Sequence, residues 1–199
     1  MSEERGRLVF QDEAGLLDLP LPNLPGPHQI ENAGTALAAL RHLGHGEAVC
    51  EAAITQAFWP ARMQRLRQGP LIEAAPEAEI WLDGGHNPAA GRAVAATLAR
   101  MPRRPTHAIC GMLKTKDVVG YLKPLAPQIV SLSGVSIPGE QATLTAEETC
   151  AAAREAGIGA HEAADAADAL ARIISEDPHA RVLICGSLYF SGHILRSHS

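Results

Sequence analysis

A short segment, residues 80–88, places the strongest constraint on the fold of this chain. It reads Ile-Trp-Leu-Asp-Gly-Gly-His-Asn-Pro: an apolar run, an Asp, two glycines and an Asn-Pro pair. Asn87 is a favoured helix cap and Pro88 suits the first helical position, so the segment predicts a buried strand, a tight turn and a helix start. Such a turn points backbone N–H groups and the helix dipole at an anion. It is also an ordinary strand-to-helix connection in which Asp83 and Asn87 only cap, and the spacing alone leaves both interpretations open.

The alternation of apolar runs and helical patterns continues to the end of the sequence. It predicts right-handed βαβ units, and hence an α/β fold with a mainly parallel, Rossmann-like sheet that carries helices on both faces. Thr145 and Glu148 predict a capping box at the start of one helix. The expected strands cover 79–83, 106–111, 128–133, 159–162 and 181–186, and the expected helices cover 88–101, 117–125, 146–156, 166–176 and 189–196.

The first sixty residues follow a different pattern. Residues 1–7 are polar and are expected to fray, and two apolar runs within 7–21 predict a hairpin. Four prolines between 20 and 27 predict an extended loop, and two helices are expected after it. Pro60 predicts a boundary, and a second hairpin is expected over 63–74.

Three expected strand ends carry polar residues that suit a binding site. One is the turn with Asp83 and His86, the second carries Lys114, and the third carries Ser187. Because ligands of open α/β sheets bind beyond the carboxyl ends of the strands, one sheet edge would gather all three. Lys114 could hold a carboxylate or phosphate, or belong to a solvated basic loop. Ser187 could donate a hydrogen bond to a ligand, cap the last helix, or do both.

Composition excludes several other functions. A net charge of −5 without a basic block argues against nucleic acid as a partner. The four cysteines are widely spaced without a C-x-x-C pair, and the nine histidines lack metal-ligand spacing, so we expect no metal site. The same cysteine pattern predicts a cytoplasmic protein whose thiols are reduced. No apolar run approaches the roughly 18 residues of a membrane span. The phosphate-cradling G-x-x-x-x-G-K-[ST] loop does not occur.

Five segments occur in order along the chain: L-P-L-P at 19–22, G-P-H-Q-I-E-N-A at 26–33, W-P-A-R-M-Q at 59–64, L-D-G-G-H-N-P at 82–88 and C-G-S-L-Y-F at 185–190. Together they are similar to folylpolyglutamate synthase, including its bifunctional dihydrofolate synthase form, within the Mur ligase superfamily. Each segment is weak alone, but five in order are specific and they cover nearly the whole chain. Two departures are small: W-P-A-R stands for the usual W-P-G-R, and D-G-G-H-N for D-G-A-H-N.

The resemblance implies an ATP-dependent, ADP-forming ligase of folate biosynthesis and one-carbon metabolism. A carboxylate of dihydropteroate or a folate is phosphorylated by ATP, and the amino group of L-glutamate attacks the acyl phosphate. Residues 1–59 would be the end of the central ATP-binding domain and 60–199 the Mur ligase C-terminal domain. The phosphate loop and the Mg²⁺ ligands would belong to an N-terminal ATPase region that is not in this sequence. We therefore expect the 199 residues to be inactive alone; the alternative is a standalone, non-catalytic module that binds a nucleotide or glutamate.

The resemblance also implies roles for six residues. Asn32 would contact the adenine side of ATP, Arg62 its phosphates, and Asp83 its ribose or a neighbouring polar network. His86 would orient Asp83 or neighbouring groups, and Asp83 and His86 would act as a catalytic pair at the cleft between the domains. Lys114 and Ser187 would bind the incoming glutamate, by looser analogy with other Mur ligases. Asn32 as a helix-start residue and Arg62 as a salt-bridge partner are the open alternatives.

One structural expectation follows from the same resemblance. If residues 1–59 are only a remnant, their helices lack the sheet that they would normally cover. The apolar face formed by Ile30, Leu37 and Leu40 is then expected to be unusually exposed.

Overall fold

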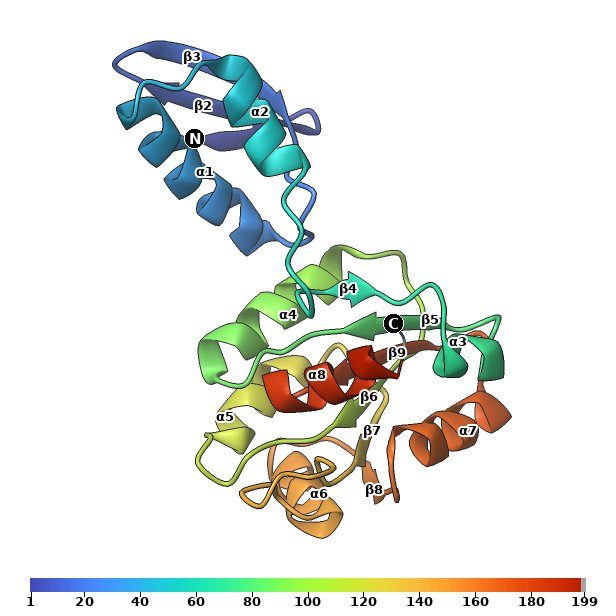
Figure 1. Ribbon diagram of the computed structural model, residues 1–199. Coiled ribbons are helices and arrows are strands. Elements are labelled where there is room, and N and C mark those ends of the chain that lie inside the picture. The colour runs from blue at the N-terminus through green and yellow to red at the C-terminus, as the bar shows by residue number, and fades with distance from the viewer. Residues whose placement is uncertain (198–199) are drawn as a thin grey trace. The chain divides into compact units, whose positions relative to one another are not determined.

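The computed structural model describes residues 1–197, and His198, which the sequence suggests to be a surface histidine, lies outside the described residues. The chain divides into two units, Met1–Pro60 and Ala61–Ser199. Both are drawn in Figure 1, and each has its own apolar core.

The first unit combines a three-stranded antiparallel sheet with two helices. Strands β2 and β3 form the predicted hairpin, in which Leu8 pairs with Leu19 and Phe10 with Leu17. The expectation that residues 1–7 fray was wrong, because Ser2–Glu4 form a strand, β1, that pairs with β2. Its three exposed polar residues carry no apolar signal. The elements are β1 (Ser2–Glu4), β2 (Arg7–Asp12), β3 (Gly15–Pro20), α1 (Pro27–His42) and α2 (Glu47–Thr55).

The apolar face of α1 is not exposed, so that expectation was wrong. Leu37 is 0% exposed, and Ile30 and Leu40 are partly buried against the same core. The reason is that β2 and β3 present alternating apolar side chains and supply the surface on which α1 packs. The buried members of this core are Leu8, Phe10, Leu17, Leu19, Ala33, Leu37, Cys50 and Ile54.

The second unit is built on a six-stranded sheet in the order β4-β5-β9-β6-β7-β8. Strand β4 is antiparallel to β5, and the other neighbours are parallel, which confirms the predicted α/β fold. The strands are β4 (Gln64–Arg65), β5 (Glu79–Leu82), β6 (Thr106–Cys110), β7 (Ser131–Gly134), β8 (Ala160–Glu162) and β9 (Arg181–Cys185). The helices are α3 (Pro70–Ala74), α4 (Pro88–Arg100), α5 (Val118–Leu122), the 3₁₀ helix η1 (Lys123–Leu125), α6 (Ala146–Glu155), α7 (Ala166–Glu176) and α8 (Leu188–Arg196).

Helices cover both faces of this sheet (Figure 1). Val94 of α4, Leu122 of α5 and Cys150 of α6 belong to one apolar core. Leu71 of α3, Leu170 of α7 and Phe190 of α8 belong to the other. Every side chain of β6 and β9 is buried, as expected for central parallel strands enclosed on both sides.

The hairpin expected over 63–74 is wrong in its second half. Residues Gln64 and Arg65 do form a strand, but it pairs with β5. Pro70 to Ala74 form helix α3, with Pro70 at its start. The proline sets a helical φ and lacks the N–H that the first helical position leaves unused, so the Gly-Pro pair starts a helix here instead of turning a hairpin.

Candidate functional site

The turn after β5 is organised by the carboxylate of Asp83. This side chain is 5% exposed. Its Oδ1 accepts the N–H of Gly85 at 2.7 Å and its Oδ2 accepts the N–H of Met63 at 2.9 Å. The carboxylate therefore joins its own turn to a segment twenty residues earlier. Asn87 caps α4 by accepting the N–H of Ala90 at 2.9 Å, which confirms that prediction.

The segment around Arg62 has an unusual backbone. Ala61 and Met63, on either side of it, have φ angles of 55° and 43°, in the left-handed region that residues other than glycine rarely adopt. The carbonyl of Ala61 accepts the N–H of Gly84 at 2.8 Å, and its N–H donates to the Gln64 side chain at 2.9 Å. Both neighbours of Arg62 are thus held against the β5 turn. Within residues 1–197 the Arg62 guanidinium makes no hydrogen bond or ion pair, so it is available to a ligand.

The imidazole of His86 faces the backbone of the same turn. Its Nδ1 lies 3.0 Å from the carbonyl oxygen of Gly84. Because a carbonyl only accepts, Nδ1 carries the proton, and Nε2 is left as the acceptor of the neutral ring. Oriented in this way, His86 can take a proton from a ligand at Nε2. Its predicted pairing with Asp83 stays a prediction, and the N–H groups of Met63 and Gly85 already orient that carboxylate.

The end of β9 lies beside this turn. Gly186 has a φ of 106°, and a Cβ there would lie 2.7 Å from the carbonyl oxygen of Gly111. Ser187 is 3% exposed and caps α8, its Oγ accepting the N–H of Tyr189 at 3.1 Å. A side chain at Gly84 would collide with Leu188, so the β5 turn and the start of α8 are in close contact. The capping role of Ser187 is confirmed, and its hydroxyl proton is not used by that bond.

Lys114 lies in the loop after β6. Its Nζ is 3.8 Å from Oε1 of Glu148, and its side chain is 53% exposed. Glu148 belongs to the predicted capping box of α6, in which it accepts the N–H of Thr145 at 2.8 Å. Strands β5, β9 and β6 are consecutive in the sheet, so Asp83, Ser187 and the Lys114 loop follow one another along one edge. Asn32 belongs to the first unit, where it is exposed on α1 and donates to the Gln29 side chain at 2.9 Å.

Tyr121 was not predicted as part of this region, although its ring lies against the turn. It is fully buried, and a Cβ on Gly85 would lie 3.5 Å from its ring. Burial raises the pKa of its hydroxyl well above the usual value. Gly91 allows the approach, because a side chain there would overlap the Tyr121 carbonyl. The sequence did contain a signal for this contact. A glycine at position 91 of an amphipathic helix indicates that a neighbouring element packs closely against the helix there.

Two searches of the described residues bear on cofactors and membranes. Among residues 1–197 no group of three or more His, Cys, Asp or Glu side chains is arranged to hold a metal ion. Over the same residues, no helix has the length and apolar character needed to cross a bilayer.

A family model for the Mur ligase glutamate ligase domain matches residues 61–188, the segment that contains the β5 turn, the Lys114 loop and the start of α8. The chain belongs to the Mur ligase family. It is 28% identical over 197 residues to the probable bifunctional folylpolyglutamate synthase/dihydropteroate synthase of Haloferax volcanii. The aligned region covers 95% of this chain and 22% of that relative. The resemblance to folylpolyglutamate and dihydrofolate synthases is thereby confirmed.

Solved structures of Mur ligase family members agree with the fold. E. coli FolC in complex with DHPP and ADP superposes with a TM-score of 0.79 at 27% identity, over 98% of this chain and 44% of that one. Mycobacterium tuberculosis folylpolyglutamate synthase complexed with ADP gives 0.77 at 28%, over 92% and 42%. This chain therefore spans less than half the length of the ligases that it matches.

Proposed function

We propose that this chain is the glutamate-ligase part of an ATP-dependent enzyme that joins L-glutamate to dihydropteroate or to a folate. The observation that carries the proposal is the convergence of three family segments. The backbone of Ala61 and Met63 is hydrogen-bonded to the turn at 83–85, and Leu188 of the third segment lies over that turn. Segments far apart in the sequence thus build one sheet edge, where ligands of such folds bind.

In this proposal Arg62 binds the phosphates of ATP. A guanidinium suits phosphate oxygens because its N–H groups form paired, charge-assisted hydrogen bonds. The hydrogen bonds to the backbone of Ala61 and Met63 fix the position of the Arg62 backbone beside the β5 turn. Asp83 is then a positioning residue that holds this segment through the N–H of Met63. Asn32 is assigned to the adenine side of ATP by resemblance alone.

Lys114 and Ser187 are proposed to bind the incoming glutamate. The ammonium of Lys114 suits one carboxylate, and the hydroxyl proton of Ser187 can be donated to another oxygen. In the reaction, the glutamate nitrogen forms the new C–N bond, the bond from the acyl carbon to phosphate breaks, and the nitrogen loses a proton. His86, with Nε2 unprotonated, is the proposed acceptor of that proton.

The other half of the chemistry is assigned elsewhere. Forming the acyl phosphate needs groups that hold the transferred phosphoryl and Mg²⁺. We propose that these groups lie in an ATP-binding domain beyond these 199 residues. We also propose a cytoplasmic location, which the four free, buried cysteines support.

The proposal is tested first by binding. ¹⁵N-labelled chain titrated with L-glutamate should show saturable shifts at residues 111–115 and 186–189, and Lys114→Ala should weaken binding about tenfold, the worth of one charged hydrogen bond. Lys116→Ala, in the same loop, is the matched control. Shifts elsewhere, or equal affinity in both variants, would contradict the assignment.

The proposal is tested next by turnover in a ligase that carries this chain with its ATP-binding domain. Arg62→Ala should reduce ATP use about ten- to a hundredfold and leave folate binding near wild type. Arg67→Ala is the control. Glutamate binding without any folate-dependent ADP release in that protein would favour a non-catalytic binding module instead.

A further inference from the structure

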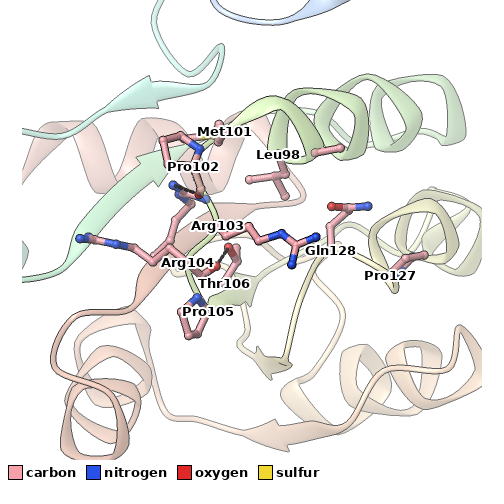
Figure 2. Close-up of a pocket in the computed structure, with 11 residues that line it drawn as sticks. Leu98, Met101, Pro102, Arg103, Arg104, Pro105, Thr106, Pro127 and Gln128 are labelled. Carbon is pink, nitrogen blue, oxygen red and sulfur yellow. Dashed lines mark hydrogen bonds between the residues drawn. The ribbon is translucent and has the colours of Figure 1, made fainter.

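The opposite edge of the sheet, at the amino end of β6, is also hollowed. A pocket of about 630 Å³ opens there between the end of α4, the loop that leads into β6, and Pro127 and Gln128 after η1 (Figure 2). Strand β6 has five residues at roughly 3.3 Å each, so this pocket is about 16 Å from the edge that carries Asp83 and Ser187. The ligase reaction described above does not use it.

The charge around this pocket is unbalanced. Glu79 is the carboxylate partner of three guanidiniums: Arg181 at 3.1 Å, Arg65 at 3.3 Å and Arg104 at 3.6 Å. One negative charge cannot neutralise three positive ones. Arg181 is held rigidly, with its side chain 4% exposed and its Nη2 donating to the Pro102 carbonyl at 3.1 Å. No acidic side chain is among the described residues that line the pocket.

Arg103 adds a further positive charge and faces the pocket directly. Figure 2 shows its guanidinium extending across the opening towards the amide of Gln128, while that of Arg104 points the other way. Within residues 1–197 Arg103 makes no hydrogen bond or ion pair. Three of the residues that line the pocket are prolines, whose rings fix the backbone φ, and two are large apolar residues. The prolines are 102, 105 and 127, and the apolar residues are Leu98 and Met101.

We propose that this pocket is an anion site for a small molecule that carries two or more negative charges on oxygen, of the diphosphate type. Arg103 and the Gln128 amide contact the oxygens, and the excess charge of Arg104 and Arg181 attracts the anion. Guanidiniums bind phosphate and carboxylate oxygens alike. A diphosphate is favoured over a single carboxylate because the field comes from several arginines at once. The proposal rests on this pocket alone and does not depend on the ligase assignment.

The test is a titration of the ¹⁵N-labelled chain with sodium pyrophosphate, at ionic strength matched with NaCl. Saturable shifts are expected at 98–106 and at Gln128. Arg103→Gln should weaken binding at least about tenfold. Glu79→Gln should strengthen it, because Arg104 and Arg181, which line the pocket, lose the carboxylate that they share. Arg92→Gln, the same charge change earlier on α4, is the control and should leave the affinity unchanged.

Other outcomes overturn the proposal. Chemical-shift changes that NaCl alone reproduces would show general screening of charges by salt. Changes confined to residues 83–90 would place the anion at the sheet edge that carries Asp83 and Ser187. Equal weakening by Arg103→Gln and Arg92→Gln would show a response to net charge only. A parallel titration with triglutamate separates carboxylate from phosphate ligands: tighter binding of triglutamate than of pyrophosphate at the same residues would overturn the diphosphate assignment.

Discussion

Asp83 shows how a single buried carboxylate can set the geometry of a site that it does not complete by itself. Its two hydrogen bonds, to the N–H groups of Gly85 and Met63, hold the β5 turn against the segment around Arg62. The residue type and its place at a strand end were evident from the sequence. Its partners were not, because they are backbone groups brought close by left-handed conformations at Ala61 and Met63, which those residue types do not indicate.

The first prediction at this scale concerns Asp83→Asn. The amide replaces one acceptor oxygen by an N–H₂ group, so a buried N–H of Met63 or Gly85 loses its partner. We expect the free energy of unfolding to fall by about 1–3 kcal/mol, measured by urea denaturation. Asp18→Asn, in an exposed pair with Arg7, should cost less than about 1 kcal/mol. If Asp83→Asn lowers the free energy of unfolding no more than Asp18→Asn does, Asp83 has no structural role.

A second residue-scale prediction concerns Gly186→Ala. The position has a φ of 106°, and a Cβ would lie 2.7 Å from the Gly111 carbonyl oxygen, so backbone strain and a collision act together. Gly139, with a φ of 78° and open space around it, is the matched control for the strain alone, which costs about 1–2 kcal/mol. Gly186→Ala should therefore cost clearly more than Gly139→Ala in thermal unfolding. Similar melting temperatures would show that the β9 end relaxes easily.

At the scale of elements, the alternating pattern after residue 79 was predictable nearly throughout. All five expected strands and five helices occur there, because apolar runs and amphipathic helices alternate and the ends carry caps such as Thr145 and Asn87. The order of the strands in the sheet was not predictable, since it depends on the side of the preceding strand on which each crossover connection places the next strand. The hairpin predicted over 63–74 was wrong in its second half because a Gly-Pro pair suits both a turn and a helix start.

Glu79 provides a prediction about how two elements are joined. It links β5 to Arg181 of β9. Burial by itself would raise the pKa of Glu79, but the hydrogen bond from Arg181 and the charges of Arg104 and Arg65 hold the pKa below its usual 4.5. The folded state thus keeps this carboxyl charged at a pH where the unfolded chain binds a proton. The resulting stability is fully present above about pH 4.5 and is lost as the pH falls through the lower, folded-state value.

The measurement compares wild type with Glu79→Gln by urea denaturation at several pH values. Wild type should be more stable at pH 7, and the difference should shrink steadily below about pH 4.5. A difference that stays constant down to pH 3 would show that the charge of Glu79 contributes nothing to the link between β5 and β9.

At the scale of the whole molecule, each unit has its own core, and this makes a local prediction possible. Leu37 is 0% exposed within the core of the first unit. Leu37→Ala should lower the stability of that unit by about 2–5 kcal/mol through lost burial and a cavity. Hydrogen exchange measured by mass spectrometry should accelerate in residues 1–60, and peptides from 79–190 serve as the internal reference. Unchanged exchange in α1 and β2 would contradict the core assignment.

The two edge strands of the larger sheet have a consequence for how the protein behaves in a crowded solution. Strand β4 offers two residues, of which Arg65 is exposed, and β8 offers three, ending in exposed His161 and Glu162. A strand from another molecule finds few N–H and C=O groups to pair with at either border, and charges beside them. The enclosed strands β6 and β9, whose apolar sequences would otherwise be aggregation hazards, are thereby kept out of reach. The folded protein is thus protected from strand-to-strand association by the borders of the sheet as much as by the helices that cover its faces.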